Sequence, residues 1–66
     1  RAASVLALSA NEARTTGAAL ELVEQTAPSA PGSNCVRIYA EDNGSGKTRL
    51  MALFPTGSAQ QIAIEP

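Results

Sequence analysis

The sequence predicts an all-β fold of about five short strands. Two segments of alternating apolar residues, 36–41 and 48–54, flank the polar loop Asp-Asn-Gly-Ser-Gly-Lys, which is the pattern of a β-hairpin. A third alternating segment covers residues 60–65, after the turn sequence Pro-Thr-Gly-Ser. These observations predict a small β-rich domain built around the hairpin.

The hairpin has one face of apolar side chains and one face that carries its basic residues, because strand side chains alternate between the two faces of a sheet. On the second face, Arg37 and Tyr39 come from the first arm and Arg49 from the second. We expect the last strand to add Ile62 and Ile64 to the apolar face. The apolar set is then Val36, Ile38, Leu50, Ala52, Phe54, Ile62 and Ile64.

The N-terminal part is less defined. Residues 2–10 alternate as a strand would, but their alanine content also suits a helix, and the run is too short for periodicity to decide. We favour a strand, paired as a first hairpin of Val5–Ser9 with Ala19–Glu24. A helix over residues 11–25 is the alternative, which the Thr-Thr-Gly in its middle disfavours.

The chain divides into three parts within one small domain. Its middle part, Thr-Ala-Pro-Ser-Ala-Pro-Gly-Ser-Asn, has two prolines three residues apart, which favour extended polyproline geometry. We interpret it as a linker. The parts are an N-terminal hairpin or arm (1–25), the linker (26–34), and the central hairpin with the final strand (35–66).

A chain of 66 residues has room for one domain, which is marginally stable alone. Small domains are usually reinforced by disulfides, a metal or oligomerisation. Cys35 is the only cysteine, there is no histidine, and the six acidic residues are scattered, so we expect neither an intrachain disulfide nor a metal site. With only Tyr39 and Phe54 as aromatic residues, we expect an obligate oligomer.

The charge pattern does not favour nucleic acid or a membrane as a partner. The formal net charge is −1, and the basic residues are dispersed rather than gathered as nucleic-acid binders gather them. No stretch approaches the length of about 20 apolar residues that spans a membrane. Residues 3–10 are also too short for a span and lack a convincing signal-peptide pattern.

The residues do not form a catalytic motif, and we expect no enzyme and no cofactor. Gly46-Lys47-Thr48 has the letters that close a phosphate-binding loop, but that motif needs glycine at position 41, where Glu41 stands. Without histidine, Cys35 has no Cys-His partner and no Ser-His-Asp arrangement is available. Glu41 and Asp42 are adjacent near a loop and do not face each other across a cleft as glycosidase carboxylates do.

The chain from residue 26 onward resembles segments of tailed-bacteriophage virion proteins. The resemblance is carried by Thr-Ala-Pro-Ser-Ala-Pro-Gly-Ser-Asn, then Val-Arg-Ile-Tyr-Ala-Glu-Asp-Asn-Gly, then Gly-Lys-Thr. Phe-Pro-Thr-Gly and the ending Gln-Gln-Ile-Ala-Ile-Glu-Pro are similar to short phage virion proteins and tail-fibre segments. The departures are a longer loop at 42–47 and no glycine directly before Val36, and residues 1–25 match no such pattern.

The resemblance implies a homotrimer in which each chain lends hairpins to a shared core, in a virion assembled in the bacterial host cytoplasm. We expect a non-enzymatic capsid decoration (cement) protein that stabilises the head. The alternative is a tail-fibre or tailspike trimerisation or attachment module, and a remote one is a small nucleic-acid-binding accessory protein. We expect the apolar set to form the trimer interface, and Arg37, Tyr39 and Arg49 to contact coat or neighbouring virion proteins.

Overall fold

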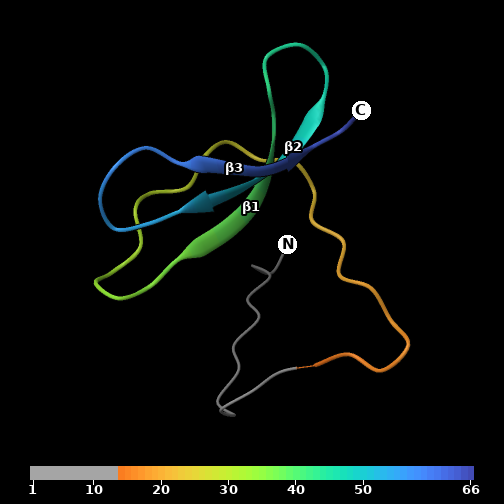
Figure 1. The fold of residues 1–66 in the computed structure, drawn as a ribbon, viewed down its shortest axis with the longest axis horizontal. Coiled ribbons are helices and arrows are strands. Elements are labelled where there is room, and N and C mark those ends of the chain that lie inside the picture. The colour runs from red at the N-terminus through yellow and green to blue at the C-terminus, as the bar shows by residue number, and fades with distance from the viewer. Residues whose placement is uncertain (1–13) are drawn as a thin grey trace, which may run out of the picture.

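The computed structural model describes residues 14–66, which form one antiparallel sheet of three strands (Figure 1). β1 spans Arg37–Asp42, β2 spans Thr48–Leu53 and β3 spans Gln60–Ile64. The order in the sheet is β1-β2-β3, so each strand pairs with the next along the chain. The described part of the chain contains no helix, which confirms the predicted all-β class.

The predicted first hairpin is not present in the described residues. Ala19–Glu24 forms no strand, and Val5–Ser9 lies outside the described residues. What remains is an isolated parallel bridge between Glu24 and Ala40, where the Gln25 N–H donates to Ala40 O at 2.9 Å. Within the described residues this is the one main-chain contact between the segment and β1, and the Leu20 and Val23 side chains before it are exposed. Figure 1 shows this segment leaving the sheet.

The central hairpin is present as predicted. β1 and β2 pair from Arg37 opposite Leu53 to Asp42 opposite Thr48 without interruption. Beyond that last pair, the Asn43 N–H donates to Lys47 O at 2.9 Å and closes the loop.

Side chains of the hairpin itself fix its loop. The Gly44 N–H donates to Asp42 Oδ2 at 2.8 Å, and the Ser45 N–H donates to Asn43 Oδ1 at 2.7 Å. Such Asx contacts imitate a backbone turn. Gly44 and Gly46 have φ of 94° and 83°, a region that residues with a Cβ rarely adopt. The sequence Asp-Asn-Gly-Ser-Gly therefore supplies both the acceptors and the backbone freedom that this turn needs.

β3 follows a turn at residues 54–59 and pairs with β2 in a shifted register. Leu50 lies opposite Ala63, but Met51 lies opposite Gln61, so Ile62 is an extra residue, as in a β-bulge. After β3, the Glu65 N–H donates to Thr48 O at 2.8 Å, and Lys47 Nζ donates to Pro66 O. These contacts hold the end of the chain beside the hairpin loop.

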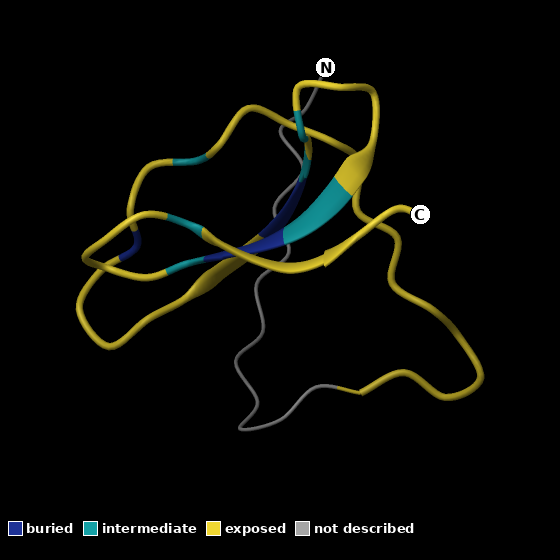
Figure 2. Ribbon diagram, turned by 45° about the horizontal axis from the view of Figure 1, so that its top comes forward, coloured by how far each residue is buried: buried dark blue, intermediate teal, exposed yellow. Residues whose placement is uncertain are grey.

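The core is small and lies in the middle of β1 and β2 (Figure 2). Its apolar members are Tyr39, Ala40, Met51 and Ala52, and Tyr39 is the largest, at 2% exposed. Pro31, in the segment before β1, is also buried. Tyr39, three smaller apolar residues and one proline are a thin core for the described part of the chain.

The proline-containing segment, which we interpreted as a linker, also contacts the sheet. Arg37 Nη1 donates to Ser29 O at 2.8 Å and lies 3.2 Å from Ser29 Oγ. Because Arg37 and Tyr39 share a face of β1, these contacts bring the segment with Pro31 over that face. Residues 32–35 then form a turn, with the Cys35 N–H donating to Gly32 O at 3.2 Å.

Candidate interaction surface

One face of the sheet carries mainly apolar side chains that the described residues leave partly exposed. Ile38 lies opposite Ala52, and Ala40 lies opposite Leu50, so these four share a face. Val36 precedes β1 and Phe54 follows β2 in the same alternation. We call Val36, Ile38, Leu50, Ala52 and Phe54 the apolar face.

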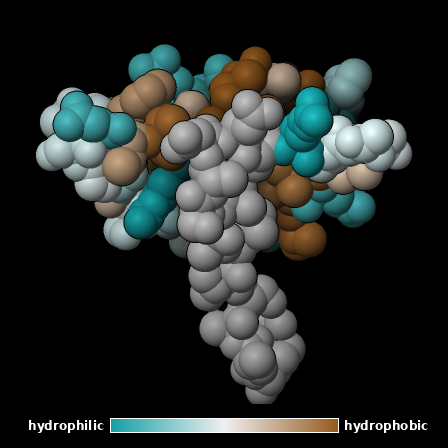
Figure 3. Space-filling model, turned by 90° about the horizontal axis from the view of Figure 1, so that it is seen from below, coloured by the Kyte–Doolittle hydropathy of each residue, from teal (hydrophilic) through white to brown (hydrophobic). Residues whose placement is uncertain are grey.

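The large side chains of the apolar face are about half exposed. Val36 is 47% exposed, Ile38 is 48% exposed and Phe54 is 42% exposed. Ala52 is buried and Leu50 is intermediate. Figure 3 shows hydrophobic side chains at several places on one side of the molecule, with hydrophilic side chains between them. A contiguous apolar area on a small domain marks a site of contact with another molecule.

We predicted that Ile62 and Ile64 belong to the apolar face, but the structure does not place them there. Ile64 lies opposite Arg49, and Arg49 belongs to the face of Tyr39 and Met51. Ile62 is the extra residue of the register shift. Both are exposed, at 54% for Ile62 and 41% for Ile64. The shift between Leu50 and Met51 is the physical reason, because one inserted residue inverts the alternation of a strand.

The opposite face is largely occupied by the chain itself. Tyr39 is buried opposite Met51, so its side chain is not exposed in the described structure, where we had predicted that it makes an intermolecular contact. Arg37 binds Ser29 of the same chain. Arg49 is paired with Glu41. The three residues predicted to contact neighbouring virion proteins therefore have intramolecular roles here.

The Glu41–Arg49 pair is the main electrostatic contact of this face. The two residues are directly opposed in the β1–β2 register, and Arg49 Nε donates to Glu41 Oε2 at 2.9 Å, with Nη2 donating to the same oxygen. The side chains are 30% exposed for Arg49 and 16% exposed for Glu41. Partial burial reduces solvent screening, so the pair helps to fix the register of the hairpin.

Three carboxylates lie around a shallow, open depression of about 510 Å³ between residues 24–27 and the end of β1. Each carboxylate binds a group of the same chain. Glu24 Oε2 accepts a hydrogen bond from Thr48 Oγ1, Glu41 binds Arg49, and Asp42 accepts from the Gly44 N–H. In residues 14–66 no cluster of His, Cys, Asp or Glu is arranged to hold a metal ion. The carboxylates of this depression therefore hold the local structure together.

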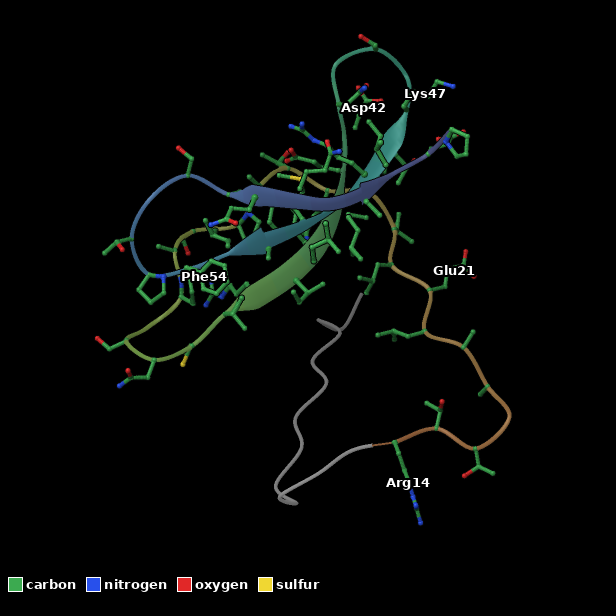
Figure 4. All side chains as sticks on the ribbon, viewed as in Figure 1. Arg14, Glu21, Asp42, Lys47 and Phe54 are labelled. Carbon is green, nitrogen blue, oxygen red and sulfur yellow. The ribbon has the colours of Figure 1, made fainter. Side chains whose placement is uncertain are left out.

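The loop at 43–47 does not have the structure of a phosphate-binding loop. A strand follows Lys47, whereas the phosphate motif needs a helix N-terminus there. The N–H groups of Gly44 and Ser45 are bound by the chain's own Asp42 and Asn43, and Lys47 binds Pro66 O. Figure 4 shows Asp42 and Lys47 at this end of the hairpin, with Phe54 at the other end of β2. The hairpin interpretation of this loop is confirmed.

Sequence reasoning missed the covering of Tyr39 and the tie of Glu24 to Thr48. The Pro-x-x-Pro spacing was a signal for the extended geometry of the covering segment, but not for the face it contacts. Cys35 is exposed in the turn before β1.

Comparison of the chain with models of known protein families, with curated proteins and with solved structures found no significant match. Residues 14–66 include no helix with the length and apolar character to cross a membrane. The fold and surface described above are therefore the basis for proposing a function.

Proposed function

We propose that the chain is a non-enzymatic structural protein that works by associating with copies of itself, as a homotrimer. The observation that carries this proposal is the apolar face, on which Val36, Ile38 and Phe54 are each more than two-fifths exposed. Burying one such side chain contributes roughly 1.5–3 kcal/mol. Three copies of the face would form a core larger than the four buried apolar residues that one chain provides.

The setting we propose is a bacteriophage virion, in which the trimer serves as a capsid decoration (cement) protein bound to coat protein. The support is the resemblance of residues 26–66 to tailed-phage virion proteins, together with a hairpin at the place where the resemblance puts one. A small rigid sheet without a deep cleft in its described part suits a clamp between larger subunits. The tail-fibre or tailspike module remains the alternative, and it is favoured if the chain is a segment of a longer protein.

Sedimentation of the purified chain at several concentrations tests the self-association. We expect a trimer that dissociates on dilution, and we expect Ile38→Ser/Phe54→Ser to shift the equilibrium toward the monomer. Arg14→Ser/Thr56→Ser is the matched control, because both residues are exposed and lie away from the apolar face. A sharply melting monomer at all concentrations would rule the proposal out.

The virion setting needs its own test. Mass spectrometry of purified particles is expected to find the chain at many copies, and its loss is expected to lower particle resistance to heat or low salt. Salt-dependent retention of the purified chain on DNA would instead support the nucleic-acid-binding alternative. Absence of the chain from intact particles would contradict a virion role without affecting the self-association.

A further inference from the structure

Among residues 14–66, the outer edge of β3 is an open sheet edge. The strand order leaves β3 with β2 as its one partner, and all five residues of Gln60–Ile64 are exposed. We find no main-chain hydrogen bond on its outer side within residues 14–66. By contrast, the outer edge of β1 has the bridge to Glu24.

This edge lacks the features that usually prevent strand addition. Proteins protect exposed edges with lysine, proline, inward-pointing charges or a covering segment. The sequence Gln-Gln-Ile-Ala-Ile has no charge and no proline, and its Ile62 and Ile64 are exposed. The register shift within β3 is the one protective feature present. An extended segment with apolar side chains fits such an edge, because main-chain hydrogen bonds and alternate side chains recognise it together.

The chain itself carries a segment of that kind, residues 18–23, which we call the arm. Its sequence is Ala-Ala-Leu-Glu-Leu-Val, and Leu20 and Val23 are 75% and 80% exposed. The arm follows Gly17 at φ 70° and forms no strand in the described structure. Its far end is fixed by the Gln25–Ala40 and Glu24–Thr48 contacts. Figure 4 places Glu21 away from the sheet.

We infer that the arm of one copy pairs with the β3 edge of a neighbouring copy. The arm is attached at the outer edge of β1. The open edge belongs to β3, at the opposite side of the sheet, so the arm and the open edge of one chain do not meet along the sheet. Each copy contributes one arm to a neighbour and accepts the arm of another copy at its β3 edge. This is a head-to-tail contact, which closes into a ring if the rotation between neighbouring copies allows it. The inference rests on the proposed homotrimer and specifies its contact.

Disulfide trapping between two kinds of chain tests the contact. Both chains carry Cys35→Ser; one also carries Leu22→Cys, and the other, made larger by a tag, carries Gln61→Cys, Ile62→Cys or Ala63→Cys. Paired strands bring opposed Cα atoms within the roughly 4.4–6.8 Å that a disulfide requires. We expect a covalent product of unlike chains after mixing and oxidation for at least one of the three positions. We expect neither kind of chain alone to cross-link comparably.

A second measurement does not depend on register. Leu20→Asn/Val23→Asn removes the two most exposed apolar side chains of the arm, and Thr16→Asn/Ser33→Asn, at two exposed polar residues outside the arm, is the matched control. We expect the arm variant to raise the concentration of half-association by roughly tenfold or more. In hydrogen–deuterium exchange, we expect the peptide covering Gln60–Ile64 to lose protection in that variant and not in the control.

The outcomes separate the two proposals. A wild-type chain that is monomeric throughout overturns both of them. A wild-type trimer that gives no product of unlike chains, and whose arm variant associates normally, overturns the arm contact and leaves the association through the apolar face standing.

Discussion

Glu41 and Arg49 face each other across β1 and β2, and two nitrogens of the Arg49 guanidinium donate to the single oxygen Glu41 Oε2. The pair lies on the same face as Tyr39 and Met51, at the end of the hairpin nearer the loop. An ion pair in this position favours one register of the hairpin, because a slip of β2 by one residue would move Arg49 to the face opposite Glu41.

Removing the arginine is expected to destabilise the chain more than removing both partners. Arg49→Met leaves the carboxylate of Glu41, which is 16% exposed, without its donors, and we expect a loss of about 1–3 kcal/mol in the free energy of unfolding. The double variant Glu41→Gln/Arg49→Met should recover part of that loss. Urea denaturation of the four proteins in a double-mutant cycle measures the coupling. A loss in the double variant equal to the sum of the two single losses would show that the pair is uncoupled.

Truncating Tyr39 is expected to unfold the chain. Tyr39 is 2% exposed, and deleting a large buried side chain costs about 3–5 kcal/mol. At about 0.05–0.15 kcal/mol per residue, a chain of this length has a stability of only about 3–10 kcal/mol. Circular dichroism of Tyr39→Ala should show loss of the sheet.

Ile38→Ala is the control for Tyr39→Ala, because Ile38 lies next to Tyr39 on the opposite face and is 48% exposed. In dilute solution it should melt close to the wild type. If Ile38→Ala were as damaging as Tyr39→Ala in a dilute monomer, the core would lie on the apolar face and our assignment of the two faces would be wrong.

The effect of Phe54→Ala is expected to depend on protein concentration. Phe54 is 42% exposed in the single chain, so the isolated chain should lose little stability. In the proposed trimer the ring is buried, and the loss should rise to about 3–5 kcal/mol per chain. Thermal melts over a wide concentration range measure the difference. A loss that is the same at every concentration would contradict burial of this ring between copies.

Gly46→Ala is expected to weaken the hairpin through backbone strain alone. At φ 83° a Cβ is unfavourable by about 1–2 kcal/mol, while no atom lies within 4 Å of the added Cβ, so no clash contributes. Gly46→Asn should be milder, because asparagine tolerates this region.

Gly32→Ala is the control for Gly46→Ala, since Gly32 has open space around it without a positive φ and should tolerate the change. Chemical denaturation of the three variants gives the ranking. If Gly32→Ala were the most damaging, the cost would come from the segment before β1 rather than from the hairpin loop.

The elements that the sequence predicted well are those determined by local pattern. Alternation on both sides of an Asn-Gly loop predicted β1, β2 and the hairpin between them, and the apolar run at 60–65 predicted β3. The sequence predicted that the hairpin members of the apolar face lie on one side of the sheet, and the β1–β2 register places them together.

What the sequence did not show depends on contacts between distant residues. The burial of Pro31 and the Arg37–Ser29 contact need the segment before β1 to turn back over one face, which no local pattern specifies. The shift at Ile62 inverted the predicted face of Ile64, because alternation alone assumes an uninterrupted ladder. The strand predicted at Ala19–Glu24 had the alternation, but in the described residues it pairs with β1 only through the bridge at Glu24.

The turn contacts at Asn43 also affect the chemical stability of this residue. An asparagine followed by glycine is prone to deamidation, in which the glycine nitrogen attacks the asparagine side-chain carbon and ammonia leaves. Here the hydrogen on Gly44 N is held by Asp42 Oδ2, and Asn43 Oδ1 is held by the Ser45 N–H. These contacts restrict the rotation of the Asn43 side chain and of the Gly44 peptide group that the attack requires. We therefore expect this Asn-Gly step to remain chemically intact for as long as the hairpin stays folded, and to convert to isoaspartate mainly in unfolded chains.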